Sequence, residues 1–244
     1  DYLYRYESIG KRFKLYRDRV QAAGGALLLA DQSAEFAAQQ SDQAAGVAAS
    51  AIGLGGRMGG VPIYKNGLFT VDTSVKGVME SLMPLAKYND PQIYQRYQFW
   101  AGWKRARRLI QEGRERLYEP ADAKIAQDLE RMYPEFIQVQ KDLNAFNEGL
   151  VKLAVQSGVL SKERGDLYMK YADYVPFYRE DQLEQGMGPK EYIRGLKVQA
   201  KERKLKGSDK PVNDIFDNQV RWVQYAINRA VRNRSAIALA DTAV

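Results

Sequence analysis

The sequence contains no cysteine and no histidine among its 244 residues. Without cysteine, the chain has no disulfide, no thiol nucleophile and no thiolate ligand for a metal ion. Without histidine, it lacks the commonest general base, the imidazole of a Ser-His-Asp triad and the usual nitrogen ligand of zinc. Enzyme chemistry is therefore limited to carboxylate, lysine, tyrosine and hydroxyl groups, and a non-enzymatic role gains weight.

Paired carboxylates are the main enzyme chemistry left open. Asp173, Glu180 and Asp181 lie close together, and Glu112 and Glu115 are one helical turn apart. Neither group stands in a glycosidase or two-metal context. We therefore expect no catalytic residue, no cofactor and no metal site in this segment, which leaves open an enzyme domain elsewhere in a longer parent chain.

Long uncharged apolar runs are also absent. The nearest candidate, residues 43–56, consists mostly of Ala and Gly and is shorter than the roughly 20 apolar residues of a membrane-spanning helix. Hydrophobic residues make up 45% of the chain, which is an ordinary globular share and predicts a folded core. Because the chain opens at Asp1 rather than Met and shows no signal-peptide pattern, we expect it to be an excerpt of a longer protein.

Most of the sequence has helical periodicity. Helices are expected over residues 2–22, 31–52, 74–87, 91–118, 121–156, from Ser161 to about 173, and from Asn213 to the C-terminus. The clearest apolar seam alternates steps of four and three and comprises Ile125, Leu129, Met132, Phe136, Val139, Leu143, Phe146, Leu150 and Leu153. Such a seam is typical of a long helix packed against near-parallel neighbours, within a bundle or between copies. Pro134 should kink or split this helix near Tyr133. Earlier in the chain, Asp90 is expected to cap the helix whose first position is Pro91.

Two short stretches interrupt the helices. The glycine-rich stretch 53–60 lacks the Gly-Lys-Ser/Thr ending of a P-loop, and Met58 stands where a dinucleotide-binding loop needs its third glycine, so a flexible connector is predicted. In VPIYKNGLFTV (61–71), β-forming arms flank Asn66-Gly67, which predicts a β-hairpin.

The predicted fold is mainly α: an elongated multi-helix bundle with long antiparallel helices and one small β-hairpin near 61–71. We divide the chain into residues 1–60, a helical hairpin with a connector, and residues 61–244, the bundle module.

The chain is basic, with 37 Lys and Arg against 30 Asp and Glu and a net charge of +7. This charge favours acidic partners such as nucleic acid or anionic lipid. The alternative interpretation is a basic soluble protein without such a partner. One basic stretch follows the aromatic residues 94–103, although Tyr97 and Trp100 also fit a buried face. A second, residues 190–210, holds eight Lys or Arg against three acids and is equally typical of a solvated face. Candidate nucleic-acid-binding residues are Lys104, Arg105, Arg107, Arg108, Lys197, Lys201, Arg203, Lys204 and Lys206.

The segment 158–179, GVLSKERGDLYMKYADYVPFYR, predicts a packed corner. Pro176 fixes its own φ and disfavours the α conformation at Val175, so the tyrosine-rich helix before it must end. The corner would join the long helix to the C-terminal helix. Its predicted members are Tyr174, Val175, Pro176, Tyr178 and Arg179.

Several motifs occur together in a recognisable order. They are Trp100-Ala101 with Arg105-Ala106, Leu109 and Gly113-Arg114-Glu115; Gly-Val-Leu-Ser-x-Glu at 158–163; Tyr174-Val175-Pro176-Phe177-Tyr178-Arg179; and Asn228, Ala230 and Asn233. In this order, over about residues 60–240, the sequence resembles the large polyvalent-protein-associated helical domains of tailed phages and mobile elements. It is also similar to internal virion (core or ejection) proteins of short-tailed phages.

The resemblance implies a non-enzymatic module of a very large bacteriophage protein that lies in the virion interior and is ejected with the genome. After DNA ejection it would lie in the host cell envelope or cytoplasm and help to form a conduit for DNA. The implied partners are copies of itself (a homo-oligomer) or sister virion proteins, and phage DNA, with only an indirect membrane contact. The alternative is a nucleic-acid-binding helical module of a mobile-element polyvalent protein.

Overall fold

A computed structural model of the chain describes residues 44–53, 59–111, 113, 118–119, 121–169 and 215–242. Most of these residues are helical, and their strands form one two-stranded antiparallel sheet, which confirms the predicted mainly helical fold with a small hairpin. The predicted corner (Tyr174, Val175, Pro176, Tyr178 and Arg179) and five predicted basic residues (Lys197, Lys201, Arg203, Lys204 and Lys206) lie outside the described residues.

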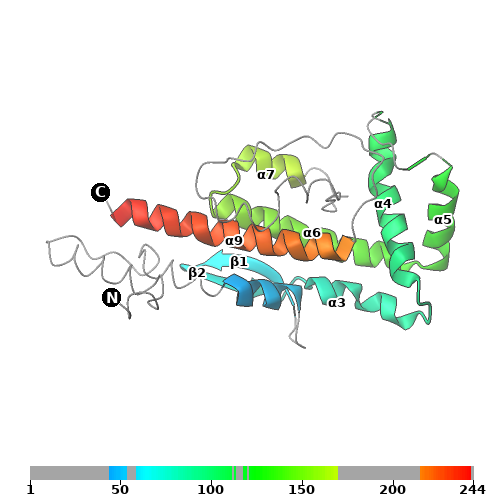
Figure 1. Ribbon diagram of the computed structural model, residues 1–244, viewed down its shortest axis with the longest axis horizontal. Helices are drawn as coiled ribbons and strands as arrows, with labels where there is room; N and C mark the ends of the chain where they lie inside the picture. The colour runs from blue at the N-terminus through cyan, green and yellow to red at the C-terminus, as the bar shows by residue number, and fades with distance from the viewer. Residues whose placement is uncertain are drawn as a thin grey trace, which may run out of the picture. The chain divides into compact units, whose positions relative to one another are not determined.

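Residues 44–52 form the first described helix. The elements that follow (Figure 1) are β1 (Val61–Lys65), β2 (Leu68–Asp72), α3 (Val78–Leu82), the 3-10 helix η4 (Met83–Lys87), α4 (Ile93–Gln111), α5 (Asp122–Met132), α6 (Glu135–Gln156), α7 (Lys162–Met169) and α9 (Ile215–Thr242). The chain divides into two compact units. Unit 1 takes its residues from 1–81, 145–172 and 222–244, and unit 2 from 82–144 and 173–221.

The β-hairpin of unit 1 is built around its two-residue turn. Asn66 and Gly67 have φ angles of 52° and 80°, the left-handed values that a tight hairpin turn requires. The turn sets the register, which pairs Lys65 with Leu68 and Val61 with Asp72. At the open end, Ser74 N donates to Asp72 Oδ1 at 2.9 Å. Because this turn occupies the residues after β2, α3 begins at Val78 rather than at Ser74 as predicted.

Unit 1 assembles segments that are far apart in the sequence. Asn233 of α9 donates from Nδ2 to the backbone oxygen of Ser157, just after α6, at 2.6 Å. On the same helix, the guanidinium of Arg234 lies over the ring of Tyr64 in β1, 4.9 Å from its centroid. The core of unit 1 is therefore made by α6, α9 and the hairpin together, with Phe146, Leu150, Leu153, Val223, Ile227 and Ala230 buried.

In unit 1, the parts of α6 and α9 run in the same direction (Figure 1), and the C-terminal end of α6 lies beside Asn233 of α9. Long antiparallel helices were predicted without stating which helices pair, and these two helices are parallel. Antiparallel neighbours need only a short loop between them, whereas a parallel pair needs a long crossover. Residues 157–214, which separate the two helices in the sequence, provide one.

Unit 2 contains the antiparallel arrangement that was expected. Successive residues of α4, namely Lys104, Trp100 and Tyr97, contact Glu130, Phe136 and Gln140. The helices α4 and α5 lie side by side and run in opposite directions, whereas α6 crosses the N-terminal part of α4 (Figure 1). The helix α4 ends at Gln111 rather than near Tyr118, because Gly113 adopts a φ of 65° and its N–H bonds to Ile110 O.

The predicted break at Pro134 is confirmed, since α5 ends at Met132 and α6 begins at Glu135. Within α6 the predicted seam is buried at Phe136, Val139, Leu143, Phe146, Leu150 and Leu153. Within α5 it is wrong at Ile125 and Met132, which are 52% and 54% exposed. The seam residue Leu129 is buried as predicted, together with Ala126. The break changes the helix axis, so the rest of the seam does not continue into α5.

Candidate functional site

A connected group of polar side chains lies in unit 2, around the break between α5 and α6. We call it the interhelix polar cluster; its members are Lys87, Tyr88, Asp90, Arg96, Tyr133 and Glu135. Three elements supply them: the end of η4 and the turn after it, the first turn of α4, and the residues on both sides of Pro134. Because Pro134 interrupts the helix, Tyr133 adopts φ −131° and ψ 70° between α5 and α6.

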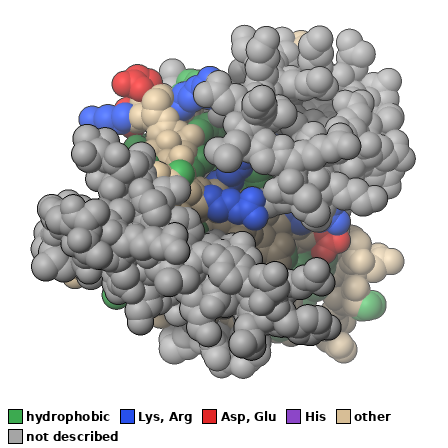
Figure 2. Space-filling model, turned by 60° about the vertical axis from the view of Figure 1, so that its left-hand side comes forward, with side chains coloured by type: hydrophobic (Ala, Val, Ile, Leu, Met, Phe, Trp, Pro, Cys, Tyr) green, Lys and Arg blue, Asp and Glu red, His purple; other side chains and the backbone are tan. Residues whose placement is uncertain are grey.

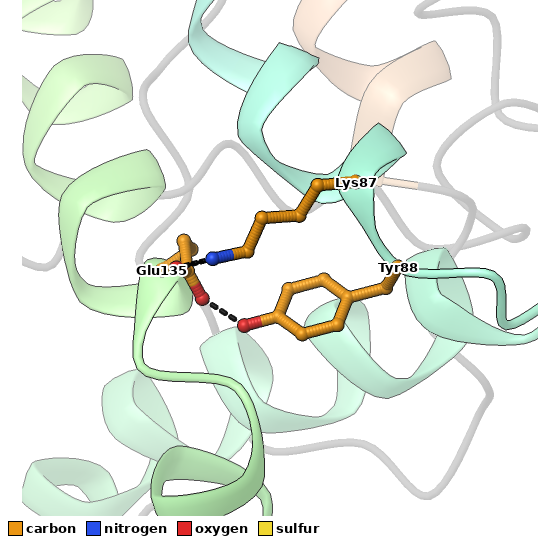
Figure 3. Close-up of polar contacts among 3 residues, drawn as sticks. All are labelled: Lys87, Tyr88 and Glu135. Carbon is orange, nitrogen blue, oxygen red and sulfur yellow. Dashed lines mark hydrogen bonds and ion pairs between the residues drawn. The ribbon is translucent and has the colours of Figure 1, made fainter.

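Glu135 receives two donors from neighbouring residues of one segment (Figure 3). The ammonium of Lys87 donates to its Oε1, and the hydroxyl of Tyr88 donates to its Oε2. The ammonium of Lys87 also lies 5.0 Å from the centroid of the Tyr88 ring. Both oxygens of this carboxylate therefore join the start of α6 to the end of η4.

Asp90 performs a similar role on α4. Its Oδ1 accepts from the backbone N–H of Gln92 at 2.8 Å, which confirms the predicted cap, and its Oδ2 accepts from the Tyr133 hydroxyl at 2.8 Å. Arg96 Nε lies 2.9 Å from the same Oδ2. The Gln92 N–H, followed by the hydroxyl of Tyr133 and by Arg96, holds the pKa of Asp90 below its ordinary value despite an opposing desolvation effect. The hydrogen bond to Asp90 in turn raises the pKa of Tyr133.

Beneath the cluster lies an aromatic core centred on Phe136. The ring of Tyr133 stacks on Phe136 at 5.2 Å, and Tyr97 meets the same ring edge-on at 5.4 Å. Trp100 contacts it at 5.5 Å. Tyr97 is buried, which raises the pKa of its phenol, and its hydroxyl donates to Gln140 Oε1 at 3.0 Å. Rings from α4 and α6 thus fill the space under the polar groups.

A third carboxylate, Glu130 of α5, lies against Trp100 of this core. Its Oε2 accepts from Lys104 Nζ at 2.7 Å and from Trp100 Nε1 at 3.0 Å. The ammonium of Lys104 also lies 5.4 Å from the Trp100 ring centroid. The hydrogen bond from Lys104, and that from Trp100, lower the pKa of Glu130 against the opposing effect of its partial burial.

The chemistry that this arrangement supports is structural. A general acid at neutral pH needs a raised carboxyl pKa, whereas Asp90 and Glu130 have lowered ones and are held ionised by their donors. Glu135 has a donor on each oxygen. In the described ranges, acidic side chains are not grouped in threes that could hold a metal ion. The carboxylates act here as acceptors that join helices.

The predicted basic residues on α4 do not lie in one environment. Lys104 is ion-paired with Glu130, and Arg105 is buried, with 7% of its surface exposed. Arg107 is exposed, and the side chain of Arg108 lies outside what the structure describes. Figure 2 draws one face of the molecule, on which Lys and Arg side chains of the described residues appear at separate places. The face built from Tyr97 and Trp100 is buried, as the packing interpretation predicts.

Sequence reasoning missed most of the interhelix polar cluster. Asp90 was predicted only as a cap, and Glu130 and Glu135 were not singled out. A usable signal was present, since two acids flank a helix break that also holds a tyrosine. The donors, however, lie 26 to 48 positions away, and nothing in the local pattern indicates them.

No protein-family model, curated protein or solved structure gives a significant match to this chain. Among the described helices, none is long and apolar enough to cross a membrane.

Proposed function

We propose that this chain is a non-enzymatic structural module of a large phage internal virion protein, ejected with the genome and helping to form a conduit for DNA. The observation that carries its non-enzymatic character is the use of carboxylates in unit 2. Glu130, Glu135 and Asp90 accept hydrogen bonds from side chains of other helices and turns, so the groups best suited to catalysis are used in packing. The virion assignment is supported by the order of the sequence motifs.

The two units differ in how well they suit passage through a phage tail. A chain that crosses a narrow channel unfolded must refold afterwards, and local pairings refold fastest. In unit 2, the described residues 82–144 are consecutive helices that pack on their sequence neighbours. Unit 1 instead joins residues as distant as Tyr64 and Arg234. We therefore expect unit 2 to refold before unit 1.

Mass spectrometry of purified particles tests the proposal directly. The particles are those of the phage or element whose genome encodes the chain, and peptides from both units are expected in them after nuclease and protease treatment of the particle exterior. A lysate of infected cells is the matched control, because it shows whether the protein is made at all. Detection in the lysate with absence from protected particles would overturn the proposal.

A nucleic-acid-binding module is the second candidate. One observation favours it: Arg107 of α4 is exposed, and no carboxylate among the described residues pairs with it. If residues 104–116 and 190–210 bind DNA, charge reversal at Arg107, Arg108, Lys201 and Lys204 should sharply reduce an affinity that falls steeply with salt. Unchanged binding of this variant would remove the candidate in that form.

A further inference from the structure

Most of the part of α9 that belongs to unit 1 carries positive charge only, because its one acidic residue, Asp241, stands close to the end of the helix. From Trp222 to Ala240 the helix has three arginines and no aspartate or glutamate. A solvated helix face usually mixes both signs of charge, because alternating pairs stabilise the helix. A stretch with arginine alone has a field that attracts anions.

Two of the three arginines lie on one side of the helix. The apolar side of α9 packs into the core of unit 1. The buried residues on this side are Val223, Ala226, Ile227, Ala230 and Val231. Arg234 turns toward β1, where its Nη2 lies 3.4 Å from the hydroxyl oxygen of Tyr64. Tyr225, Arg229 and Arg232 fall on the opposite side, where all three are exposed. We call Trp222, Tyr225, Arg229 and Arg232 the α9 arginine face.

The geometry of this face prepares Arg229 to bind an anion. The rings of Trp222 and Tyr225 stack at 5.9 Å with 19° between their planes. The guanidinium of Arg229 lies over the Tyr225 ring, 5.3 Å from its centroid. A guanidinium held by its planar surface keeps its N–H edge free for the oxygens of a phosphate. Among the described residues, no carboxylate pairs with Arg229, and Tyr225, although aromatic, is 36% exposed.

Two anionic partners could bind the α9 arginine face, namely an anionic membrane and a nucleic acid, and the burial of the apolar side of α9 distinguishes between them. A helix that binds an anionic membrane inserts an apolar face below the headgroups. Here the apolar side of α9 is buried inside unit 1 and is not available for insertion. A nucleic acid requires no insertion. It offers a row of phosphates, one of which Arg229 can contact, while Arg232, one turn further along, adds positive charge beside it.

We propose that the α9 arginine face binds the phosphate backbone of DNA. This goes beyond the proposed function and does not depend on it, because the surface is defined by unit 1 alone. It also differs from the basic stretches predicted at 104–116 and 190–210. The face therefore assigns DNA contact to a helix that sequence analysis treated only as a core element.

Fluorescence anisotropy of labelled single-stranded and duplex DNA with the 244-residue chain tests this proposal. Binding is measured from about 50 to about 200 mM salt, where phosphate contacts lose affinity steeply. The test variants are Arg229→Gln and the double variant Arg229→Gln/Arg232→Gln. The matched control is Lys141→Gln/Lys152→Gln, which removes the same charge from two exposed positions of α6. Circular dichroism melting verifies that each variant is folded.

The expected result is a salt slope that decreases by about one for Arg229→Gln and by at least that amount for the double variant. The control variant should retain the wild-type slope within about half a unit. Equal loss in test and control variants would overturn the proposal, because it would show an effect of net charge only. Absence of DNA binding by the folded wild-type chain at about 50 mM salt, or binding only to vesicles of anionic lipid, would also overturn it. None of these outcomes bears on whether the chain is found in virions.

Discussion

The hydroxyl of Tyr133 donates to Asp90 Oδ2 at 2.8 Å, which joins the residue before the Pro134 break to the residue that caps α4. Through this one hydrogen bond, the geometry of the α5–α6 break depends on the start of another helix 43 residues earlier. The ring of Tyr133 also contacts Tyr88 and Phe136, so polar and apolar contacts can be separated by a conservative substitution.

Tyr133→Phe keeps the ring and removes only the hydroxyl. The free energy of unfolding should decrease by about 1 kcal/mol, as for the loss of an ordinary hydrogen bond. The pKa of Asp90 should rise towards its ordinary value, because one of the groups that lower it is lost. Urea unfolding measures the first effect and carboxyl NMR titration the second. A pKa of Asp90 that is the same in both proteins would contradict the assigned hydrogen bond.

The stability of unit 2 should depend on pH through Glu130. Lys104 lowers the pKa of this carboxyl in the folded state, so on acidification the unfolded chain binds the proton first. The contribution of Glu130 is thus complete above its ordinary pKa of 4.5 and is lost as the pH falls through the lowered folded value.

Glu130→Gln tests this pH dependence. The difference in unfolding free energy between wild type and variant should be largest near neutral pH and should narrow below about pH 4. Glu148→Gln is the matched control, since Glu148 is an exposed residue of α6. Denaturant unfolding at several pH values measures both variants. A difference that stays constant down to acid pH would show that Glu130 does not contribute as an ionised acceptor.

Gly149→Ala should destabilise unit 1. A Cβ added at Gly149 would lie 2.2 Å from Val61 Cγ1, so α6 and β1 would have to separate. Overpacking of this kind decreases the free energy of unfolding by about 1–3 kcal/mol. Adding Val61→Ala should recover part of the loss, because it removes the clashing methyl groups.

Gly46→Ala is the control for that prediction. Gly46 also lies in a helix, but a Cβ there would meet no atom within 4 Å. The same chemical change should therefore stabilise the protein by up to about 1 kcal/mol through helix propensity. Opposite signs for the two glycines in thermal unfolding would support the close approach of α6 and β1. Equal effects would contradict it.

Two adjacent residues of α6 provide a test of the aromatic core. Phe136→Ala removes a fully buried ring that touches Tyr97, Trp100 and Tyr133, and should decrease the free energy of unfolding by about 3–5 kcal/mol. Ile137→Ala changes a side chain that is 51% exposed and should have an effect within about 0.5 kcal/mol. Similar losses for both variants in urea unfolding would show that the orientation of α6 is wrong.

Features that depend on a few neighbouring residues were predictable from the sequence. The turn at Asn66-Gly67 follows from residues that tolerate positive φ, and the break at Tyr133 follows from the missing N–H and fixed φ of Pro134. The cap at Asp90 is equally local. The buried stripe of α6 was predictable because its period of 3.6 residues places every member on one side of a single straight helix.

The predictions were wrong where a sequence pattern was extended from one helix into the next. The spacing of Ile125 and Met132 continues the stripe of α6, yet both are exposed because the helix axis changes at Pro134. The direction of α9 relative to α6 also has no local signal. It follows from where the long connection between them ends, not from the sequence of either helix.

The candidate sites show the same division. The sequence contains acids, tyrosines and arginines in numbers that many surfaces share, and composition limited the chemistry by excluding cysteine and histidine. That Glu135 receives Lys87 and Tyr88, and that Arg229 lies on Tyr225 opposite the buried side of α9, are facts of tertiary packing. Backbone preferences act over a few residues, whereas the pairing of charges depends on which distant segments bury their apolar sides together.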